Sequence, residues 1–331
     1  MPVTLAQAKL NTQDALVANI IDEFRKQSAI LDAMPFDQAV NPMGGGSTLT
    51  YGYHRLVTER GAEFRELNTE YTDEKAAKER YTVDLVPLGG SYKIDRVLAQ
   101  VARGAEVAFQ VRQVIKSTVA KFTDALINGD TDDSSSDDQH GFDGLDKALT
   151  GTTTEFNAAG DEDGFDWTSL DTGYHGALDG IDLFMSLLDG PASLIIGNDR
   201  SIAKFRAIAR RANQYVERPV EGLTDGAGAP IVRGFYGNAL LVDAGQKPGS
   251  TDRIIPITNG ATDLFAVRLG LDGYHGVAVS GQEILRQWAP DFSTAGAVKR
   301  GEVEMGPCAP VLKATQAAAV VRNVQLTEAG S

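Results

Sequence analysis

The sequence has almost no cysteine. It also has too little positive charge for a protein whose main role is to bind nucleic acid. Cys308 is the only cysteine among 331 residues, so no disulfide can form within the chain. We expect Cys308 itself to be buried and to pack as a small hydrophobic side chain. The formal net charge is −14, which excludes a protein whose main surface is a basic face for phosphates. Enclosing DNA without tight contact is compatible with this charge.

Long apolar runs are also missing. The longest, residues 239–242 and 317–321, are far shorter than the roughly 18 apolar residues that a membrane span requires, so we expect no contact with a membrane. The N-terminus has no basic segment followed by an apolar one, so no secretory signal is expected. The protein should therefore be made and kept inside a cell, or inside something built there.

Signatures of enzymes are absent from the sequence. It has no Gly-x-x-x-x-Gly-Lys-Ser/Thr phosphate loop, no Gly-x-Gly-x-x-Gly and no Gly-x-Ser-x-Gly nucleophile turn. His54, His140, His175 and His275 include no pair at the i, i+4 spacing that places two metal ligands on one helix face. We expect a protein that is not an enzyme, with no catalytic residue, no cofactor and no metal ligand.

One acidic run comes closest to a metal site. Counted from Asp130, a calcium loop would need glycine at the sixth position and a bidentate acid at the twelfth, where the sequence has Ser135 and Gly141. The composition favours a polar, flexible loop instead.

Helical periodicity is clear in two places in the first half of the chain. Residues 13–31 predict an amphipathic helix that Asn11 or Thr12 caps and that ends before Pro35, followed by a hinge over residues 41–47. Residues 104–126 give the strongest signal, with apolar side chains at steps of three and four. That helix should be roughly 35 Å long and end at Asn128 and Gly129.

Between these helices, two strand-like ends, residues 47–58 and 81–88, flank a charged segment over residues 59–80. We interpret the three as one long hairpin. A two-stranded arm is marginal alone in water, so we expect it to rest on a neighbouring subunit. Its candidate contact residues are Glu59, Arg60, Arg65, Glu66, Lys75 and Lys78.

Beyond residue 165 the pattern alternates between helix and strand, which is typical of a mixed α+β domain. The predicted helices are residues 170–188 and 199–213; the predicted strands are residues 193–197, 231–235, 239–242, 254–258, 264–269, 276–280 and a long last strand, 311–326. The second helix is basic, through Arg200, Lys204, Arg206, Arg210 and Arg211. A solvated face is the favoured interpretation, and contact with DNA or with a neighbouring subunit is the alternative.

The order of these elements resembles the major capsid proteins of tailed bacteriophages, the family with the Hong Kong 97 fold. The resemblance covers nearly the whole chain. It rests on the charged loop, the return segment 81–88, the long helix with its end at 125–130 leading to 141–145, and the strand-to-helix turn at 193–200.

This resemblance implies an α+β, Hong Kong 97-like capsid fold with five parts. They are an N-terminal arm (1–46), an extended E-loop (47–90), a P domain (91–169) with a spine helix at about 104–127, an A domain (170–289) and a return to the P domain (290–331). The E-loop and the N-terminal arm would lie across neighbouring subunits. No cofactor is implied.

The resemblance implies that the chain assembles with copies of itself. These copies would form the homo-pentamers and homo-hexamers of an icosahedral shell. The shell would enclose double-stranded DNA without sequence-specific binding, in a virion assembled in the bacterial host cytoplasm. Because only a short arm precedes the E-loop, we expect a separate scaffolding protein, together with a portal and a decoration protein. Two alternatives stay open: an encapsulin-like nanocompartment, which a neighbouring cargo gene would favour, and an α+β enzyme, which turnover by a purified monomer would favour.

Some relatives join an E-loop lysine covalently to a neighbour's asparagine with help from a glutamate. Lys75 and Lys78 offer the amine, but residues 295–310 contain no asparagine. Asn259 lies too early in the chain and Asn323 too close to its end. A charged, solvated loop also gives no means of holding a lysine neutral, so we expect non-covalent shells.

Overall fold

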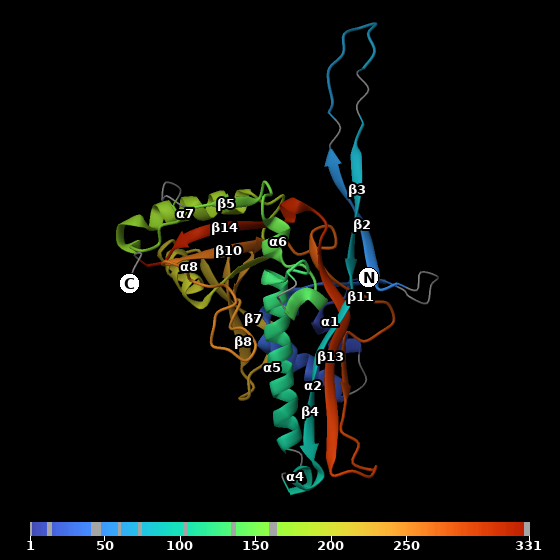
Figure 1. The fold of residues 1–331 in the computed structure, drawn as a ribbon. Coiled ribbons are helices and arrows are strands. Elements are labelled where there is room, and N and C mark those ends of the chain that lie inside the picture. Colours follow the sequence, from blue (N-terminus) through green and yellow to red (C-terminus); the bar gives the residue numbers. More distant parts are fainter. Residues whose placement is uncertain are drawn as a thin grey trace.

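The computed structural model of the chain describes residues 2–11, 15–40, 48–58, 61–71, 75–101, 105–133, 137–158 and 164–327. These residues form two sheets and a separate two-stranded ribbon that projects away from them (Figure 1). The first sheet contains β1 (Phe36–Val40), β4 (Val86–Asp95), β11 (Tyr274–Val279), β12 (Leu285–Trp288) and β13 (Val298–Leu312). Its order is β1-β11-β13-β12, with β4 also paired to β13.

A long helix, α5 (Ala105–Asn128), lies along β4 and β13 and confirms the predicted spine helix. Its buried side chains include Ile115, Val119, Phe122 and Leu126, spaced at three and four residues, so one stripe of the helix faces the core. The predicted end is also correct. A Cβ on Gly129 would lie 2.3 Å from the carbonyl oxygen of Phe142, so the turn after the helix has space only for glycine.

The N-terminal segment forms α1 (Leu5–Asn11), α2 (Ala15–Gln27) and α3 (Ala29–Ala33) instead of one helix. The prediction of a single helix over 13–31 is therefore wrong at Ser28, whose hydroxyl accepts a hydrogen bond from the Leu31 amide and caps a new helix. Thr12 and the predicted hinge, residues 41–47, lie outside the described residues.

This segment packs on its own subunit. Phe24, Leu31 and Phe36 are fully buried in the main core, which α5 shares. The described part of residues 2–40 is thus not a poorly packed arm, whereas its contact with neighbouring subunits stays a prediction. Its large apolar side chains recur at helical spacing, so they form one apolar face that packs against the main core.

The second sheet carries helices on one face and the main core on the other. Its order is β5-β14-β10-β6-β9-β8-β7, and it contains β5 (Glu155–Asn157), β6 (Leu194–Gly197), β7 (Tyr215–Thr224), β8 (Pro230–Tyr236), β9 (Ala239–Asp243), β10 (Ala261–Val267) and β14 (Ala318–Gln325). Along β6, Leu194 and Ile196 enter the main core. Ile195, on the opposite face, packs with α7 (Leu170–Ser186) and α8 (Asp199–Arg211), as strand alternation requires.

Two strand predictions are wrong. Residues 254–258 form an irregular loop, although Ile254 and Ile255 are buried. The predicted last strand, 311–326, is the end of β13, a single 3₁₀ turn (Thr315–Ala317) and β14, which belong to different sheets. Both strands are buried and apolar, so hydropathy alone could not separate them.

The chain also crosses between the sheets within the predicted A-domain range. β11 and β12 lie inside residues 170–289 but pair in the first sheet, whereas β14 lies beyond residue 290 and joins the second.

Cys308 on β13 is buried as expected, and burial raises the pKa of its thiol to about 12. No helix among the described residues is long and apolar enough to cross a membrane.

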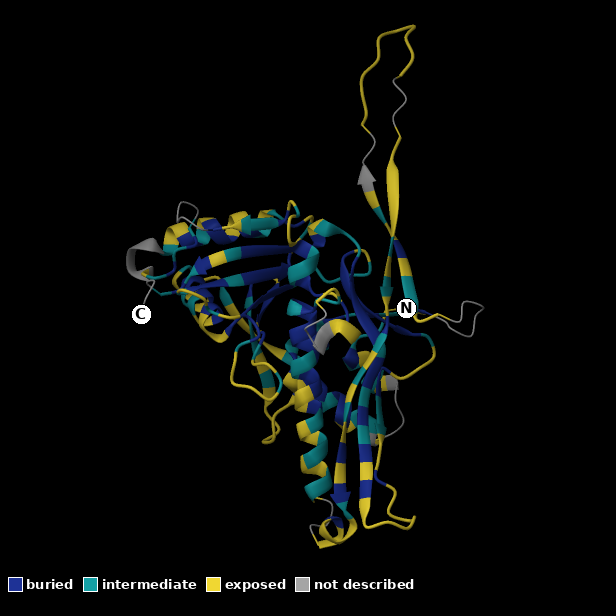
Figure 2. Cartoon of the chain, viewed as in Figure 1, coloured by how far each residue is buried: buried dark blue, intermediate teal, exposed yellow. Residues whose placement is uncertain are grey.

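The projecting ribbon consists of β2 (Thr50–Thr58) and β3 (Ala77–Asp84), paired antiparallel with Tyr53 opposite Tyr81. This confirms the predicted hairpin. The return segment 81–88 divides at Leu85, where the chain leaves the ribbon and begins β4 in the first sheet. In Figure 2 the described residues in the far half of the ribbon are coloured as exposed.

Candidate intersubunit surfaces

The base of the β2–β3 ribbon is fixed by aromatic and cationic side chains. The rings of Tyr51 and Tyr53 stack at 6.1 Å, and those of Tyr53 and Tyr81 at 5.9 Å. The guanidinium of Arg55 lies over Tyr53 and Tyr81, 5.6 and 4.7 Å from the ring centres, and its Nε donates to the Leu312 carbonyl at 3.2 Å. Cation–π contacts and a hydrogen bond thus hold the base against β13.

Beyond this base the ribbon has no core. All described residues in 61–71 and 75–80 are exposed, including three large apolar side chains: Phe64 fully, Leu67 at 89% and Tyr71 at 59%. Arg65 lies 5.4 Å from the Tyr71 ring and donates to the Thr69 carbonyl at 3.1 Å, which orders the turn locally. We call Phe64, Leu67 and Tyr71 the tip patch.

The charged residues predicted for this loop surround the tip patch. Arg65, Glu66, Lys75 and Lys78 are all exposed, and Glu59 and Arg60 lie outside the described residues. The structure therefore leaves these residues available for contact but shows no partner. The apolar residues between them were the overlooked signal, because three large apolar side chains in a solvated loop have nothing to pack against.

A second apolar surface lies at the far end of the spine helix. There α4 (Arg96–Val101) connects β4 to α5, and the start of β13 pairs beside it. Five large apolar side chains in this region are each more than half exposed: Val97, Leu98, Val101, Phe109 and Val298. We call them the spine-end patch. No helix was predicted at α4, although the step of four residues from Val97 to Val101 is helical.

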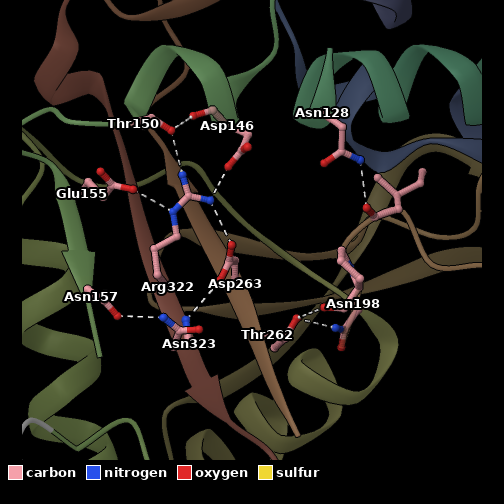
Figure 3. Close-up of polar contacts among 12 residues, drawn as sticks. Asn128, Asp146, Thr150, Glu155, Asn157, Asn198, Thr262, Asp263, Arg322 and Asn323 are labelled. Carbon is pink, nitrogen blue, oxygen red and sulfur yellow. Dashed lines mark hydrogen bonds and ion pairs between the residues drawn. The ribbon is translucent and has the colours of Figure 1, made fainter. Parts of the chain in front are cut away.

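An ion-pair cluster joins the second sheet to the short helix α6 (Figure 3). Arg322 on β14 contacts Asp146 on α6 (Leu145–Leu149), donates from Nε to Glu155 at 2.9 Å and from a terminal nitrogen to Asp263 at 2.9 Å. A backbone hydrogen bond from Gly151 and the neighbouring guanidinium hold the pKa of Glu155 below its ordinary value. One guanidinium thus bridges three carboxylates, so the cluster fastens α6, β5, β10 and β14 together.

Two asparagines hold the irregular loop at residues 254–258 (Figure 3). The Asn198 amide nitrogen donates to the Ile255 carbonyl at 3.3 Å and to Thr262 Oγ1 at 2.7 Å. Its oxygen accepts from the Ser201 amide at 2.8 Å and caps α8. Asn128, at the end of α5, donates to the Ile254 carbonyl at 2.9 Å. These side chains satisfy loop groups that a strand would have paired in a ladder.

Comparison with known proteins assigns the fold. No model of a protein family matches the sequence, and no curated protein matches it. The encapsulin of the holo-SrpI complex from Synechococcus elongatus PCC 7942 is similar in structure, with a TM-score of 0.53 and 14% identity over 86% of this chain and 85% of that chain. A chain of Mycobacterium phage Bobi gives 0.53 and 16% over 89% and 90%.

The chain has the Hong Kong 97-like capsid fold. The predicted fold class is therefore correct. In this fold the β2–β3 ribbon is the E-loop and α5 is the spine helix.

The basic helix of the Hong Kong 97-like chain does not present one continuous charged face. Lys204 donates to the carbonyl oxygens of Trp167 and Thr168, at 2.6 and 3.2 Å. Arg206 and Arg210 lie on the other side of α8, between roughly a third and a half of a turn from Lys204 at about 100° per residue, and Arg200 and Arg211 are exposed. The five residues thus divide between a structural contact and solvent-facing positions.

The acidic run after the spine helix is partly ordered. The ammonium of Lys147 lies 2.7 Å from Asp130, 2.7 Å from Asp132 and 2.9 Å from Asp143. The expectation of a flexible loop is therefore wrong for Asp130 and Asp132. Among the described residues no group of three metal-ligating side chains is arranged to hold a metal ion.

Proposed function

We propose that this chain is the major capsid protein of a tailed bacteriophage and that it has no enzymatic activity. It would assemble with its own copies into pentamers and hexamers of an icosahedral shell that encloses double-stranded DNA. The tip patch is the observation that carries this proposal: Phe64, Leu67 and Tyr71 are exposed on a ribbon with no core of its own. The Hong Kong 97-like fold supports it, because a chain of Mycobacterium phage Bobi has a similar structure.

Hydrophobic burial supplies the physical argument. Covering a large apolar side chain stabilises an association by about 1.5–3 kcal/mol, and the tip patch offers three such side chains. The spine-end patch offers five more at the opposite end of the molecule. Two different surfaces at separate places on one chain produce head-to-tail contacts, which close into rings when the rotation between subunits permits.

The further partners follow from this role. A separate scaffolding protein and a portal would take part in assembly, and a decoration protein would bind the finished shell. The chain would reside in the virion after assembly in the bacterial host cytoplasm.

A second candidate is the shell of an encapsulin-like nanocompartment. The encapsulin likeness favours it, since its TM-score equals that of the phage chain. Both candidates form closed shells, so their contents discriminate between them. Shells with nuclease-protected DNA support the capsid, whereas shells that contain a folded enzyme and no DNA support the nanocompartment.

Deleting residues 65–75, the E-loop tip, tests the proposed function. The deletion should leave a folded subunit, because no described residue of this segment is buried, but it should abolish closed shells. Far-UV circular dichroism measures the first effect and negative-stain electron microscopy the second. The point variant Glu70→Ser, at an exposed polar position of the same loop, is the control. Normal shells from the deletion would contradict the assignment.

We also propose that the shells are non-covalent. Lys75 and Lys78 are exposed, and the side chain of Asn323 donates to Asn157 at 2.8 Å within its own subunit. Neither arrangement holds a neutral lysine beside a free amide. Mature shells boiled in detergent and reductant should run as one band near 35.3 kDa, and a ladder of multimers would refute this.

A further inference from the structure

A large polar cleft lies between the spine helix and the β7–β8 hairpin, apart from both apolar patches. Its volume is about 930 Å³. The walls come from α2, α3, α5, the first half of α8, β7, β8 and the loop at residues 244–253. In Figure 1, β7 and β8 are labelled beside α5.

The charge of this cleft is opposite to that of the chain. Its lining includes two acidic side chains, Asp199 and Asp243. The basic side chains of the lining are Lys26, Lys116, Arg206, Arg233, Lys247 and Arg253. A protein of net charge −14 has thus gathered positive charge from five separate parts of its sequence into one hollow.

Several of these cations are not neutralised inside the subunit. Arg253 pairs with Asp199, with its Nε 2.5 Å from the carboxylate, and Arg233 pairs with Asp32 at 2.6 Å. Within the described part of the chain, Lys116, Arg206 and Lys247 form no ion pair. Lys26 has only a loose contact with Glu23, at 3.9 Å. Four cations therefore face the single unpaired carboxylate, Asp243.

The lining favours a ligand held by charge and hydrogen bonds. Ile202, Leu241 and Val242 contribute to the walls but are buried, so Val232, which is 51% exposed, is the main apolar side chain at the lining's surface and the lining forms no series of pockets for apolar side chains. A docked peptide helix needs such pockets. Gln113, Ser117 and Thr251 add amide and hydroxyl donors between the cations. Phosphate oxygens match this combination of groups.

We propose that this cleft holds the phosphate backbone of nucleic acid without reading the base sequence. The inference rests on the proposed function, because enclosed DNA would supply the phosphates. Neutralising about four phosphates releases about four counterions, so the logarithm of the binding constant should fall with the logarithm of salt concentration with a slope of about −3 to −4.

The test uses the full chain and short fluorescently labelled DNA duplexes of two unrelated sequences. Fluorescence anisotropy over a range of salt concentrations should give equal affinity for both duplexes and the stated slope. The double variant Lys116→Gln and Lys247→Gln should bind at least tenfold more weakly at low salt, with a slope nearer −2. Lys93→Gln, an exposed substitution on β4 outside the cleft lining, is the matched control.

Three results would overturn the proposal. They are the absence of salt-dependent binding, equal binding by the double variant and the wild type, and equally tight binding of a polyglutamate peptide that the double variant also loses. The last result would assign the cleft to an acidic protein segment. Electron microscopy of the same preparations separates the two claims, because normal shells without DNA binding leave the capsid proposal intact.

Discussion

Two long antiparallel ribbons, built from the same type of strand, have opposite environments in this molecule. The free ribbon is β2–β3 and the covered ribbon is β4–β13. Residues 77–80 on β3 are exposed without exception, whereas Tyr92 and Ile94 on β4 are buried, as are Val303 and Met305 on β13. The spine helix accounts for the difference, because it lies along the covered ribbon alone.

Glycine allows this close packing. A Cβ on Gly90 would lie 3.1 Å from a methyl group of Val114 on the spine helix, and one on Gly89 would lie 2.4 Å from the carbonyl oxygen of Val303. The free ribbon instead has exposed charged side chains on β3, at Lys78, Glu79 and Arg80. Strand pairing alone therefore does not create a core, and a ribbon without a covering helix offers its surface to another subunit.

Matched glycine substitutions test this contrast with the largest expected effect. Gly89→Ala should lower the free energy of unfolding by about 2–3 kcal/mol, because the added methyl group meets rigid backbone. Gly52→Ala in the free ribbon should cost less than about 1 kcal/mol, since its nearest neighbour is the movable end of Arg80. Urea unfolding measures both. Equal losses would show that the ribbons are packed alike.

Arginine substitutions sharpen the distinction between base and tip of the free ribbon. Arg55→Ala should lower the free energy of unfolding by about 1–2 kcal/mol, because it removes two cation–π contacts and hydrogen bonds to Leu312. Arg65→Ala should cost at most about 0.5 kcal/mol, since its contacts are exposed. Thermal unfolding compares them. A larger loss from Arg65→Ala would contradict a base-anchored ribbon.

Low pH should destabilise the subunit at the base of the β2–β3 ribbon through protonation of His275. This histidine is fully buried on β11, its ring nitrogens have no hydrogen-bond partner in the described structure, and it faces Tyr51, Lys313 and Asp37. Burial, with a smaller contribution from Lys313, lowers its pKa from the ordinary 6.5. The unfolded chain therefore binds more protons than the folded chain as pH falls below 6.5, so stability decreases with falling pH.

The variant His275→Leu should lose this part of the pH dependence. Urea midpoints between pH 7.5 and 5 should fall less for His275→Leu than for the wild type, as a leucine cannot take up the proton. His54→Leu, an exposed substitution on β2, is the control and should keep the wild-type slope. Identical slopes in all three proteins would rule out His275 as the source.

The smallest effect on the subunit is expected at the tip patch. Phe64→Ser with Leu67→Ser should change the free energy of unfolding by less than about 0.5 kcal/mol, because both side chains are already exposed. The same pair should sharply reduce shell yield in electron micrographs. A destabilised subunit would mean that the tip packs on its own chain, and undiminished shells would remove the tip patch from the interface.

Local patterns in the sequence were sufficient for elements that neighbouring residues specify. The spine helix follows from apolar steps of three and four between Ile115 and Leu126, and its end from Asn128 and Gly129. The free ribbon follows from two strand-like ends around a charged segment. Their positions depend on interactions within a few residues, which a linear sequence displays directly.

Tertiary structure decided how distant segments combine. The Arg322 cluster joins Asp146 and Glu155 to Asp263 and Arg322, which come much later in the sequence, and the basic cleft is assembled from residues between 26 and 253. The apolar run at 311–326 serves two sheets because each half finds different partners. Periodicity tells which residues are buried, but only the packing of elements against one another fixes what buries them, and that packing also leaves the tip patch exposed.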